Sequence, residues 1–516
     1  MKLSYKRTLL VGFAFFLICA FWQAYDNLIP KILTDKFGMN QANSGIIMAL
    51  DNILALFMLP LFGAISDRSR NPRGRRTPFI VRGTIIAAVA FIALAFVDAQ
   101  QLKQLDEISA IDDPAALQVI YAREHDATLQ TPDGESFVLD ELFTEEEFTA
   151  IQSQLQGDEA LYTNPDYTNY VTPARQACAH AITRSSPGTL ILFIALLLIT
   201  LLAMSTFRSP AVALMPDVTI KPLRSKANAV INLMGSAGGI LVLVLGMVFA
   251  TSAVKNSMMT YTVYFSVIAG IMLLALLIFR LTVNEPKLVQ QMHADSKRFG
   301  IEEDAAEAAG EARRLSGPEK RSLIFILLSI VLWFMGYNAV TSKYSVYASN
   351  ILHKDYNLTL ILAQAAAILA YLPVGMVASK VGRKKTILAG VVMLGVAFGV
   401  ASFLRANSPT LLMNCMFALA GIGWATINVN SFPMVVELCS GGDVGKYTGF
   451  YYTASMAAQV VTPMFSGYLM DRLGMTVLFP YATVFVALAF VTMLFVRHGD
   501  SRPVAARGLE ALDVDD

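Results

Sequence analysis

The feature that most constrains this chain is a series of twelve apolar runs, each long enough to cross a lipid bilayer. A spanning helix needs about 20 mostly apolar residues, and it satisfies its own backbone hydrogen bonds inside the bilayer. The runs lie at residues 8–29, 44–66, 78–98, 188–208, 227–251, 259–281, 322–343, 357–378, 386–404, 410–433, 448–469 and 476–496. They predict an all-α integral membrane protein with twelve transmembrane helices and a lipid-facing surface.

The composition argues against several other classes of protein. Charged residues make up 15% of the 516 residues, whereas soluble globular proteins carry roughly 25%. The net charge of +1 gives no basis for a nucleic-acid partner. The four cysteines show no paired spacing, so we expect neither a disulfide framework nor a metal site. We find no nucleotide-binding loop and no nucleophile–base motif, and therefore expect a monomer that is not an enzyme and holds no cofactor.

Two polar stretches divide the series of runs. Residues 99–187 separate the third run from the fourth, and the charged residues 284–320 separate the sixth from the seventh. The predicted organisation is three spanning helices in 1–98, an insert at 99–187, three spanning helices in 188–283, a connector at 284–320, six spanning helices in 321–497 and a tail at 498–516.

The distribution of Lys and Arg predicts the orientation, because basic residues concentrate in cytoplasmic loops. Basic clusters occur at 68–76 and at 380–385, whereas the insert has few basic residues for its length. We therefore expect both termini in the cytoplasm, the insert outside, and a plasma or inner cell membrane as the location.

A short motif repeats at equivalent positions of the two sets of six runs. Residues 63–68 are GAISDR and are followed by GRR at 74–76; residues 375–380 are GMVASK and are followed by GRKK at 382–385. Both copies resemble the G-x-x-x-[DS]-[RK]…G-[RK]-[RK] pattern of the major facilitator superfamily. The resemblance implies two pseudo-symmetric six-helix bundles and transport of a small molecule by alternating access.

The N-terminal half resembles one branch of that superfamily more closely. Residues 51–52 (DN), 74–80 (GRRTPFI) and 209–217 (SPAVALMPD), followed by Arg224 and Asn228, are similar to segments of the sucrose-transporter-like sugar–cation symporters. The resemblance implies symport of a sugar or glycoside, driven by a proton or sodium gradient. The chain departs from the plant members of this family in its insert.

Two carboxylates, Asp26 and Asp51, lie clearly within predicted spans. A carboxylate inside a bilayer costs several kcal/mol, so each is a candidate functional group. Desolvation and like charge both oppose ionisation, so the pair could bind a proton. Alternatively, the pair could hold Na⁺ together with the amide oxygens of Asn27 and Asn52. A structural role for Asp26 is also open, as a helix cap or as a partner of Lys31.

Aromatic and amide side chains near the middle of the spans predict a cavity for a neutral ligand, because sugars stack on aromatic rings and hydrogen-bond to amides. The candidate substrate-binding residues are Trp22, Gln23, Asn27, Asn52, Trp333, Tyr337, Asn338, Gln364, Trp424 and Asn428. We find no Lys or Arg at mid-depth, which argues against an anionic substrate. Each amide could instead form a helix–helix hydrogen bond.

Charged residues and glycines at the predicted cytoplasmic ends indicate a gate that closes by pairing. Its candidate residues are Gly63, Asp67, Arg68, Arg75, Arg76, Arg208, Asp217, Arg224, Gly382 and Arg383. The assignment follows the resemblance more than the spacing, and the same charges could serve only to set the topology.

The remaining alternatives concern the function and the insert. An exporter of cationic or amphipathic molecules and a non-transporting membrane sensor are both compatible with the same fold. In the insert we expect a helix start at Asp113 and a helix over 144–156. The insert could bind a partner, or it could be a small ordered cap without a role in transport.

Overall fold

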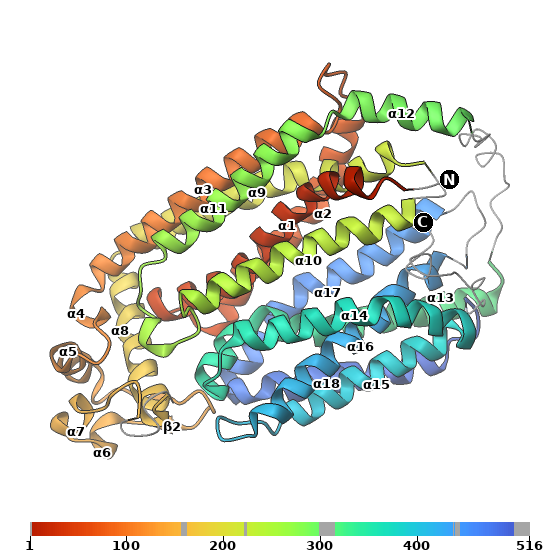
Figure 1. Cartoon of the computed structure of the whole chain (residues 1–516). Coiled ribbons are helices and arrows are strands. Elements are labelled where there is room, and N and C mark those ends of the chain that lie inside the picture. Colours follow the sequence, from red (N-terminus) through yellow and green to blue (C-terminus); the bar gives the residue numbers. More distant parts are fainter. Residues whose placement is uncertain are drawn as a thin grey trace.

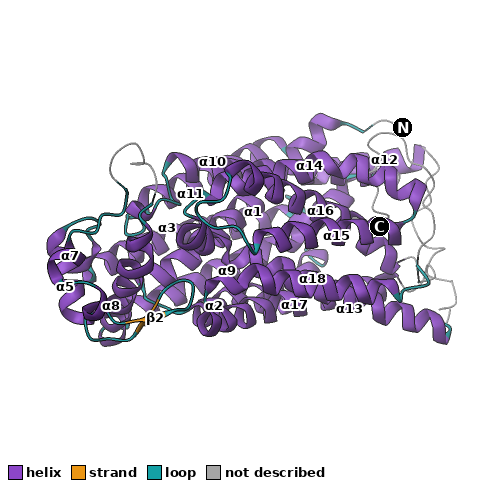
Figure 2. Ribbon diagram, turned by 90° about the horizontal axis from the view of Figure 1, so that it is seen from below, coloured by secondary structure: helices purple, strands orange, loops and turns teal. Residues whose placement is uncertain are grey.

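The computed structural model describes residues 3–155, 163–220, 224–298, 315–436, 438 and 444–499. Nearly all of this part is helical, as predicted, and its β1–β2 hairpin lies beside the short helices near α8 (Figure 2). Ten of the described helices are long and apolar enough to cross a membrane. Two further long helices, α14 and α17, occupy the other places in the predicted series, so the count of twelve stays a prediction.

The N-terminal half packs six long helices around one hydrophobic core. They are α1 (Tyr5–Lys31, continued by the π-helix η1, Ile32–Lys36), α2 (Gln41–Asp67), α3 (Thr77–Gln104), α9 (Gly188–Val218), α10 (Arg224–Val248) and α11 (Thr262–Thr282), with the short η4 (Val254–Asn256) before α11. Aromatic pairs join these helices, and the Phe91 ring stacks on Phe265 at a centroid distance of 4.3 Å.

The C-terminal half has a separate core and the same number of long helices. They are α13 (Gly317–Tyr347, continued by the π-helix η6, Ala348–Leu352), α14 (Tyr356–Val381), α15 (Arg383–Ala401), α16 (Thr410–Val436), α17 (Val444–Leu473) and α18 (Leu478–Leu494), with the short η7 (Met475–Val477) before α18. Two separate cores allow each half to move as a unit.

Between α3 and α9 the chain forms a small layer with a core of its own. Its elements are α4 (Asp106–Ser109), α5 (Pro114–Glu124), β1 (Leu129–Gln130), β2 (Ser136–Phe137), α6 (Leu139–Leu142), α7 (Glu145–Thr149), η2 (Tyr167–Val171) and α8 (Thr172–Ser185). Asp113 caps α5, as expected, by accepting a hydrogen bond from Ala115 N at 3.1 Å. The predicted helix over 144–156 is wrong beyond Thr149, because Asp112 holds Ser153 in an extended stretch through its backbone N–H and its hydroxyl.

The short elements and α12 (Glu285–Arg298) mark opposite ends of the molecule, which we call the α5 end and the α12 end (Figure 1). Helix α12 falls within the predicted connector, whose residues 299–314 lie outside the described part, as do residues 500–516 of the predicted tail. Glu285 ties α12 to the start of α3, because its carboxylate accepts hydrogen bonds from Arg76 N and from Thr77 N at 2.7–3.1 Å.

Three helix boundaries differ from the predicted ones. Helix α9 continues through Pro210 and Pro216 to Val218, although its run was expected to end at 208. Helix α3 extends to Gln104, and α13 with η6 extends to Leu352. Packing inside a bundle satisfies the backbone groups that a proline leaves unpaired, so proline alone does not end such a helix.

The two halves meet tightly at the α5 end, where α2 crosses α17. A Cβ atom at Gly45 would collide with the backbone of Pro463, and one at Gly467 would collide with the backbone of Gln41. Glycine at these two positions therefore permits the close approach of the two helices.

Candidate functional site

A cavity of about 180 Å³ lies between the two halves. Five long helices build it, three from the N-terminal half (α1, α2 and α9) and two from the C-terminal half (α13 and α17). We call it the central cavity, and its lining residues are Trp22, Asp26, Met48, Asp51, Asn52, Arg208, Asn338, Thr341, Ser342, Gln459 and Pro463. Both predicted coupling carboxylates are therefore brought to one place.

Three charged groups share the central cavity, and all of them come from the N-terminal half. Asp26 lies on α1, Asp51 on α2 and Arg208 on α9. Asn52 Nδ2 donates a hydrogen bond to Asp51 Oδ1 at 2.8 Å, which orients that carboxylate. With both carboxylates ionised, the formal charge of the three groups is −2 + 1 = −1.

Arg208 corrects two predictions. It was assigned to the gate, and no basic residue was expected at mid-depth, but it lines the central cavity. The physical reason is the length of α9, which continues ten residues beyond Arg208 and so places it inside the helix. Its guanidinium carbon lies 5.4 Å from the centroid of the Trp22 ring, in a cation–π contact.

Neutral donors also face the central cavity. The indole Nε1 of Trp22 and the amide Nδ2 of Asn338 are buried, and neither has a hydrogen-bond partner among the described residues. Buried donors normally have partners, so unpaired ones that border a cavity are suited to a polar ligand. Thr341 and Ser342 follow Asn338 by three and four residues and therefore share its face of α13. The sequence prediction missed both, although this spacing could have identified them.

The other candidate substrate residues lie outside this lining. Trp333 is fully buried in the C-terminal core, and Asn27 is buried with 5% exposure. Trp424 stacks on Tyr337 at a centroid distance of 3.7 Å, and Asn428 bonds to Tyr371. Gln364 Nε2 donates to Gln23 Oε1 at 2.5 Å and thereby joins α14 to α1. These contacts agree with the alternative that several of the candidates hold helices together.

The predicted gate residues fall into two groups at the ends of their own helices. Asp217 accepts from Arg75 Nη2 at 2.6 Å and from Arg76 Nε at 2.8 Å, and Arg76 Nη1 also donates to Ser66 Oγ. Both ion pairs stay within the N-terminal half, whereas the prediction had such pairs linking the two halves. Gly63 allows α2 to approach Ser209 of α9.

The remaining gate candidates form no described pair across the halves. Arg68 is exposed at the end of α2, and Gly382 has φ = +99° before the buried Arg383 at the start of α15. The side chains of Asp67 and Arg224 lie outside the described part of the chain.

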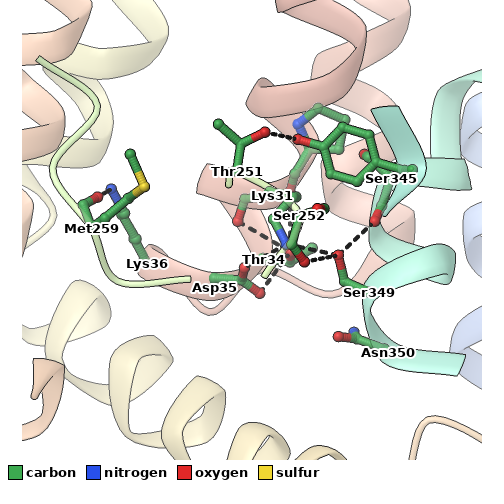
Figure 3. Close-up of polar contacts among 12 residues, drawn as sticks. Lys31, Thr34, Asp35, Lys36, Thr251, Ser252, Met259, Ser345, Ser349 and Asn350 are labelled. Atoms are coloured by element: carbon green, nitrogen blue, oxygen red, sulfur yellow. Dashed lines mark hydrogen bonds and ion pairs between the residues drawn. The ribbon is translucent and has the colours of Figure 1, made fainter. Parts of the chain in front are cut away.

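Polar contacts between the halves occur at the α5 end, and the sequence prediction missed them. Lys31 Nζ donates to Ser349 Oγ at 3.0 Å, and Thr251 bonds to the Tyr356 hydroxyl at 2.7 Å (Figure 3). The alternative role of Lys31 as a partner of Asp26 is therefore wrong, because its described carboxylate neighbour is Asp35 at 3.8 Å.

A second pair of contacts closes the same end. Lys343 Nζ donates to Gln41 O at 2.6 Å, and the Asp471 carboxylate accepts from the backbone N–H groups of Gln41 and Ala42 at 2.8 Å. Asp471 of α17 thus satisfies N–H groups of the first turn of α2 that have no partner within the helix. These contacts hold the two halves together at the α5 end.

Comparison with known proteins identifies relatives of the chain. The family model described as Major Facilitator Superfamily matches residues 177–365 and 350–512, and one described as MFS/sugar transport protein matches residues 10–102. An uncharacterised MFS-type transporter of Methanocaldococcus jannaschii is 29% identical over 126 residues. That match covers 24% of this chain and spans 30% of the relative's length.

Solved structures share the fold over nearly the whole chain. The inward-open xylose transporter XylE from E. coli has a TM-score of 0.58 at 14% identity, and covers 99% of both chains. A bacterial homologue of the iron transporter ferroportin, in an inward-facing state, has a TM-score of 0.58 at 13% identity, over 96% of this chain and 99% of that one. The nucleoside transporter NupG has a TM-score of 0.52 at 13% identity, over 94% and 99%.

Proposed function

The chain belongs to the Major Facilitator Superfamily, whose members are multi-pass membrane transporters and not enzymes, and from this premise we propose that it is a cation-coupled symporter of a sugar or glycoside. We propose further that it works by alternating access, as a monomer in a plasma or inner cell membrane. In this proposal both termini are cytoplasmic, so the α12 end faces the cytoplasm and the α5 end faces outward.

The charge of the central cavity carries the proposal. Asp26, Asp51 and Arg208 sum to −1, so one bound H⁺ or Na⁺ would bring the cavity to neutrality. An unpaired charge in a dehydrated site is costly. A cavity that is neutral only with its cation bound would therefore close and reorient more easily when loaded, which is the requirement for coupling one cation to one uncharged substrate.

The neutral wall of the cavity supports an uncharged, hydroxyl-rich substrate. Trp22 and Asn338 offer unpaired donors, and Thr341, Ser342 and Gln459 add hydroxyl and amide groups from the C-terminal half. A sugar hydroxyl both donates and accepts, so it pairs with groups of either kind. The match of residues 10–102 to a sugar-transport family model points the same way.

The size of the cavity fits a closed stage of the transport cycle. Its volume of about 180 Å³ is below the roughly 300–1,000 Å³ typical of small-molecule sites, so a disaccharide would need the halves to separate. The contacts of Lys31, Lys343 and Asp471 hold the α5 end shut. Separation at the α12 end would then admit or release the substrate.

A second candidate function follows from the same charge. A monovalent cationic substrate could itself neutralise Asp26, Asp51 and Arg208, and the protein would then be an exporter that exchanges this substrate for protons. The stacked Tyr337 and Trp424 rings nearby would suit an amphipathic cation.

Uptake into proteoliposomes tests both functions. We expect radiolabelled sucrose, maltose or xylose to accumulate under an imposed pH or Na⁺ gradient, and the two gradients applied separately identify the coupling ion. Accumulation of a tetraalkylammonium probe in place of any sugar would support the exporter. Absence of sugar uptake under either gradient would reject the symporter.

A further inference from the structure

A second cavity, of about 530 Å³, lies at the α5 end. Three parts of the molecule enclose it: the start of α2, the end of α17 with η6, and the layer between α3 and α9. Its volume falls within the roughly 300–1,000 Å³ of small-molecule sites. None of the roles assigned above uses this space, which we call the α5-end cavity.

Amide groups dominate the polar lining of the α5-end cavity. They come from all three enclosing parts: Asn40, Gln41, Asn43, Gln130, Gln176 and Asn350. None of the described lining residues is Lys or Arg, and the one carboxylate, Asp471, is occupied by the N–H groups of Gln41 and Ala42. Such a lining has no charge with which to select an ion, but it offers paired donors and acceptors to hydroxyl groups.

Two of these amides are buried and come from opposite halves. Gln41 is 5% exposed and its Oε1 has no hydrogen-bond partner among the described residues, so a buried acceptor borders the cavity. Asn350 is 7% exposed, and its Nδ2 has only the weak acceptor Met475 Sδ at 3.8 Å. Buried amides usually have better partners, which points to a ligand at this position.

We propose that the α5-end cavity binds an uncharged polyhydroxylated ligand, and that it does so only while the two halves are closed at this end. Gln41 and Asn350 are brought to the same cavity by the bonds of Lys343 and Asp471 to the start of α2. Opening the α5 end would separate the two amides and remove the site. A ligand that binds one state alone shifts the equilibrium toward that state. The occupied cavity therefore slows transport.

The layer between α3 and α9 completes this site. Its backbone contacts the C-terminal half directly, because Met475 N donates to Pro132 O at 2.6 Å and Gly134 lies against Gly474. Gln176 of α8 donates to Asp35 Oδ1 at 3.0 Å and thereby fixes α8 against η1. The layer thus acts as a wall of a binding site in this proposal, and its closure depends on the position of the C-terminal half.

Equilibrium binding tests the proposal on the purified full-length protein in nanodiscs, with radiolabelled sucrose, trehalose and sorbitol as probes. The choice of sugars as probes rests on the proposed function, but the site itself does not. We expect at least one probe to bind in a component that is lost in Asn350→Leu, which removes the amide at similar volume. Gln118→Leu is the matched control, because Gln118 pairs with Glu145 outside the cavity.

A second variant guards against misfolding. Gln130 is exposed on β1, so Gln130→Trp fills the cavity from a position that a larger side chain does not disrupt. It should abolish the same binding component and leave the size-exclusion profile unchanged. If no probe shows a component sensitive to both Asn350→Leu and Gln130→Trp, the proposal is wrong.

Transport measurements separate this proposal from the proposed function. We expect uptake to fall at high probe concentration on the α5 side, and this inhibition to be absent in Asn350→Leu. Binding that depends on Asn350 in a protein that moves no sugar would uphold the site and reject the symporter. Uptake with binding that ignores both variants would uphold the symporter and reject the site.

Discussion

The two halves share one architecture but contribute different chemistry to the central cavity. The N-terminal half supplies every charged group there, namely Asp26, Asp51 and Arg208. The C-terminal half supplies neutral groups, among them Asn338 and Ser342. Coupling to a cation requires charge that changes on binding, whereas recognition of an uncharged substrate requires hydrogen bonds. The difference suggests that the halves divide these two tasks between them.

Helices α1 and α13 show how the same sequence pattern leads to different surfaces. Trp22 and Asn27 are five residues apart on α1, as are Trp333 and Asn338 on α13. Residues five apart in a helix are about 140° apart around its axis, so only one of each pair faces the cavity. The cavity receives Trp22 from α1 but Asn338 from α13, and the other member of each pair is buried.

Replacing a charge in the N-terminal half should have the largest effect. Asp51→Asn removes one negative charge from the cavity while keeping its shape, so the empty cavity becomes neutral without a cation. We expect gradient-driven accumulation in proteoliposomes to disappear and counterflow exchange of the substrate to persist. Ser342→Ala, on the neutral wall, should raise the KM and leave the accumulation ratio unchanged. Accumulation by Asp51→Asn at the wild-type level would contradict the division of tasks.

The paired tryptophans give the next largest difference. Trp333 is fully buried in the C-terminal core, so Trp333→Ala should cost about 3–5 kcal/mol of unfolding free energy. Trp22 borders the cavity, so Trp22→Ala should weaken substrate binding and reduce stability much less.

Thermal unfolding in detergent and the KM for uptake, measured on both variants, separate the two roles. Equal losses of stability in Trp22→Ala and Trp333→Ala would show that the helices are not rotated relative to each other as described.

A smaller effect is expected at the α12 end of the N-terminal half. Asp217 joins Arg75 and Arg76, and the Arg76 side chain is 5% exposed whereas that of Arg75 is 42% exposed. Asp217→Asn should therefore destabilise the protein by about 1–3 kcal/mol, mainly by depriving a buried guanidinium of its carboxylate. Arg75→Ala removes an exposed partner and should cost at most about 1 kcal/mol. Unfolding temperatures compare the two, and an equal loss would place the main contribution on Arg75.

The sequence was sufficient to predict the helical membrane fold, because apolar runs of bilayer length have few other solutions. It also identified the two cavity carboxylates, since charge within a span is rare. The facing of individual residues could not be predicted, because Trp22 and Trp333 occupy equivalent positions in the repeat. Arg208 was misplaced for a different reason: the prolines after it suggested a helix end, and only the packing of α9 shows that the helix continues.

The contacts at the α5 end were also beyond the sequence, for a further reason. Lys343 and Asp471 bind the backbone of Gln41, and a backbone partner leaves no complementary residue to find in the sequence. These residues therefore show their role only once the two halves have been brought together.

The smallest expected effect concerns a titratable residue where the C-terminal half meets the α3–α9 layer. His353 follows η6, and its Nε2 lies 3.4 Å from Thr168 Oγ1 while its Nδ1 lies 3.2 Å from Ser349 O. Burial lowers the pKa of His353, and the charge of Lys354 acts in the same direction against the opposing effects of Ser349 O and Asp133.

Because the folded pKa of His353 lies below its unfolded value of 6.5, the contribution of the neutral ring is present above that pH and is lost as the pH falls through the folded pKa. We expect a loss of about 0.5–1 kcal/mol, the net value of one hydrogen bond, visible as a lower unfolding temperature in mildly acidic buffer. His353→Asn keeps a polar side chain that does not titrate, so its unfolding temperature should vary less with pH. Identical pH profiles would show that the contact between the layer and the C-terminal half does not depend on this ring, and that the titratable chemistry of the protein is confined still more strictly to the N-terminal half.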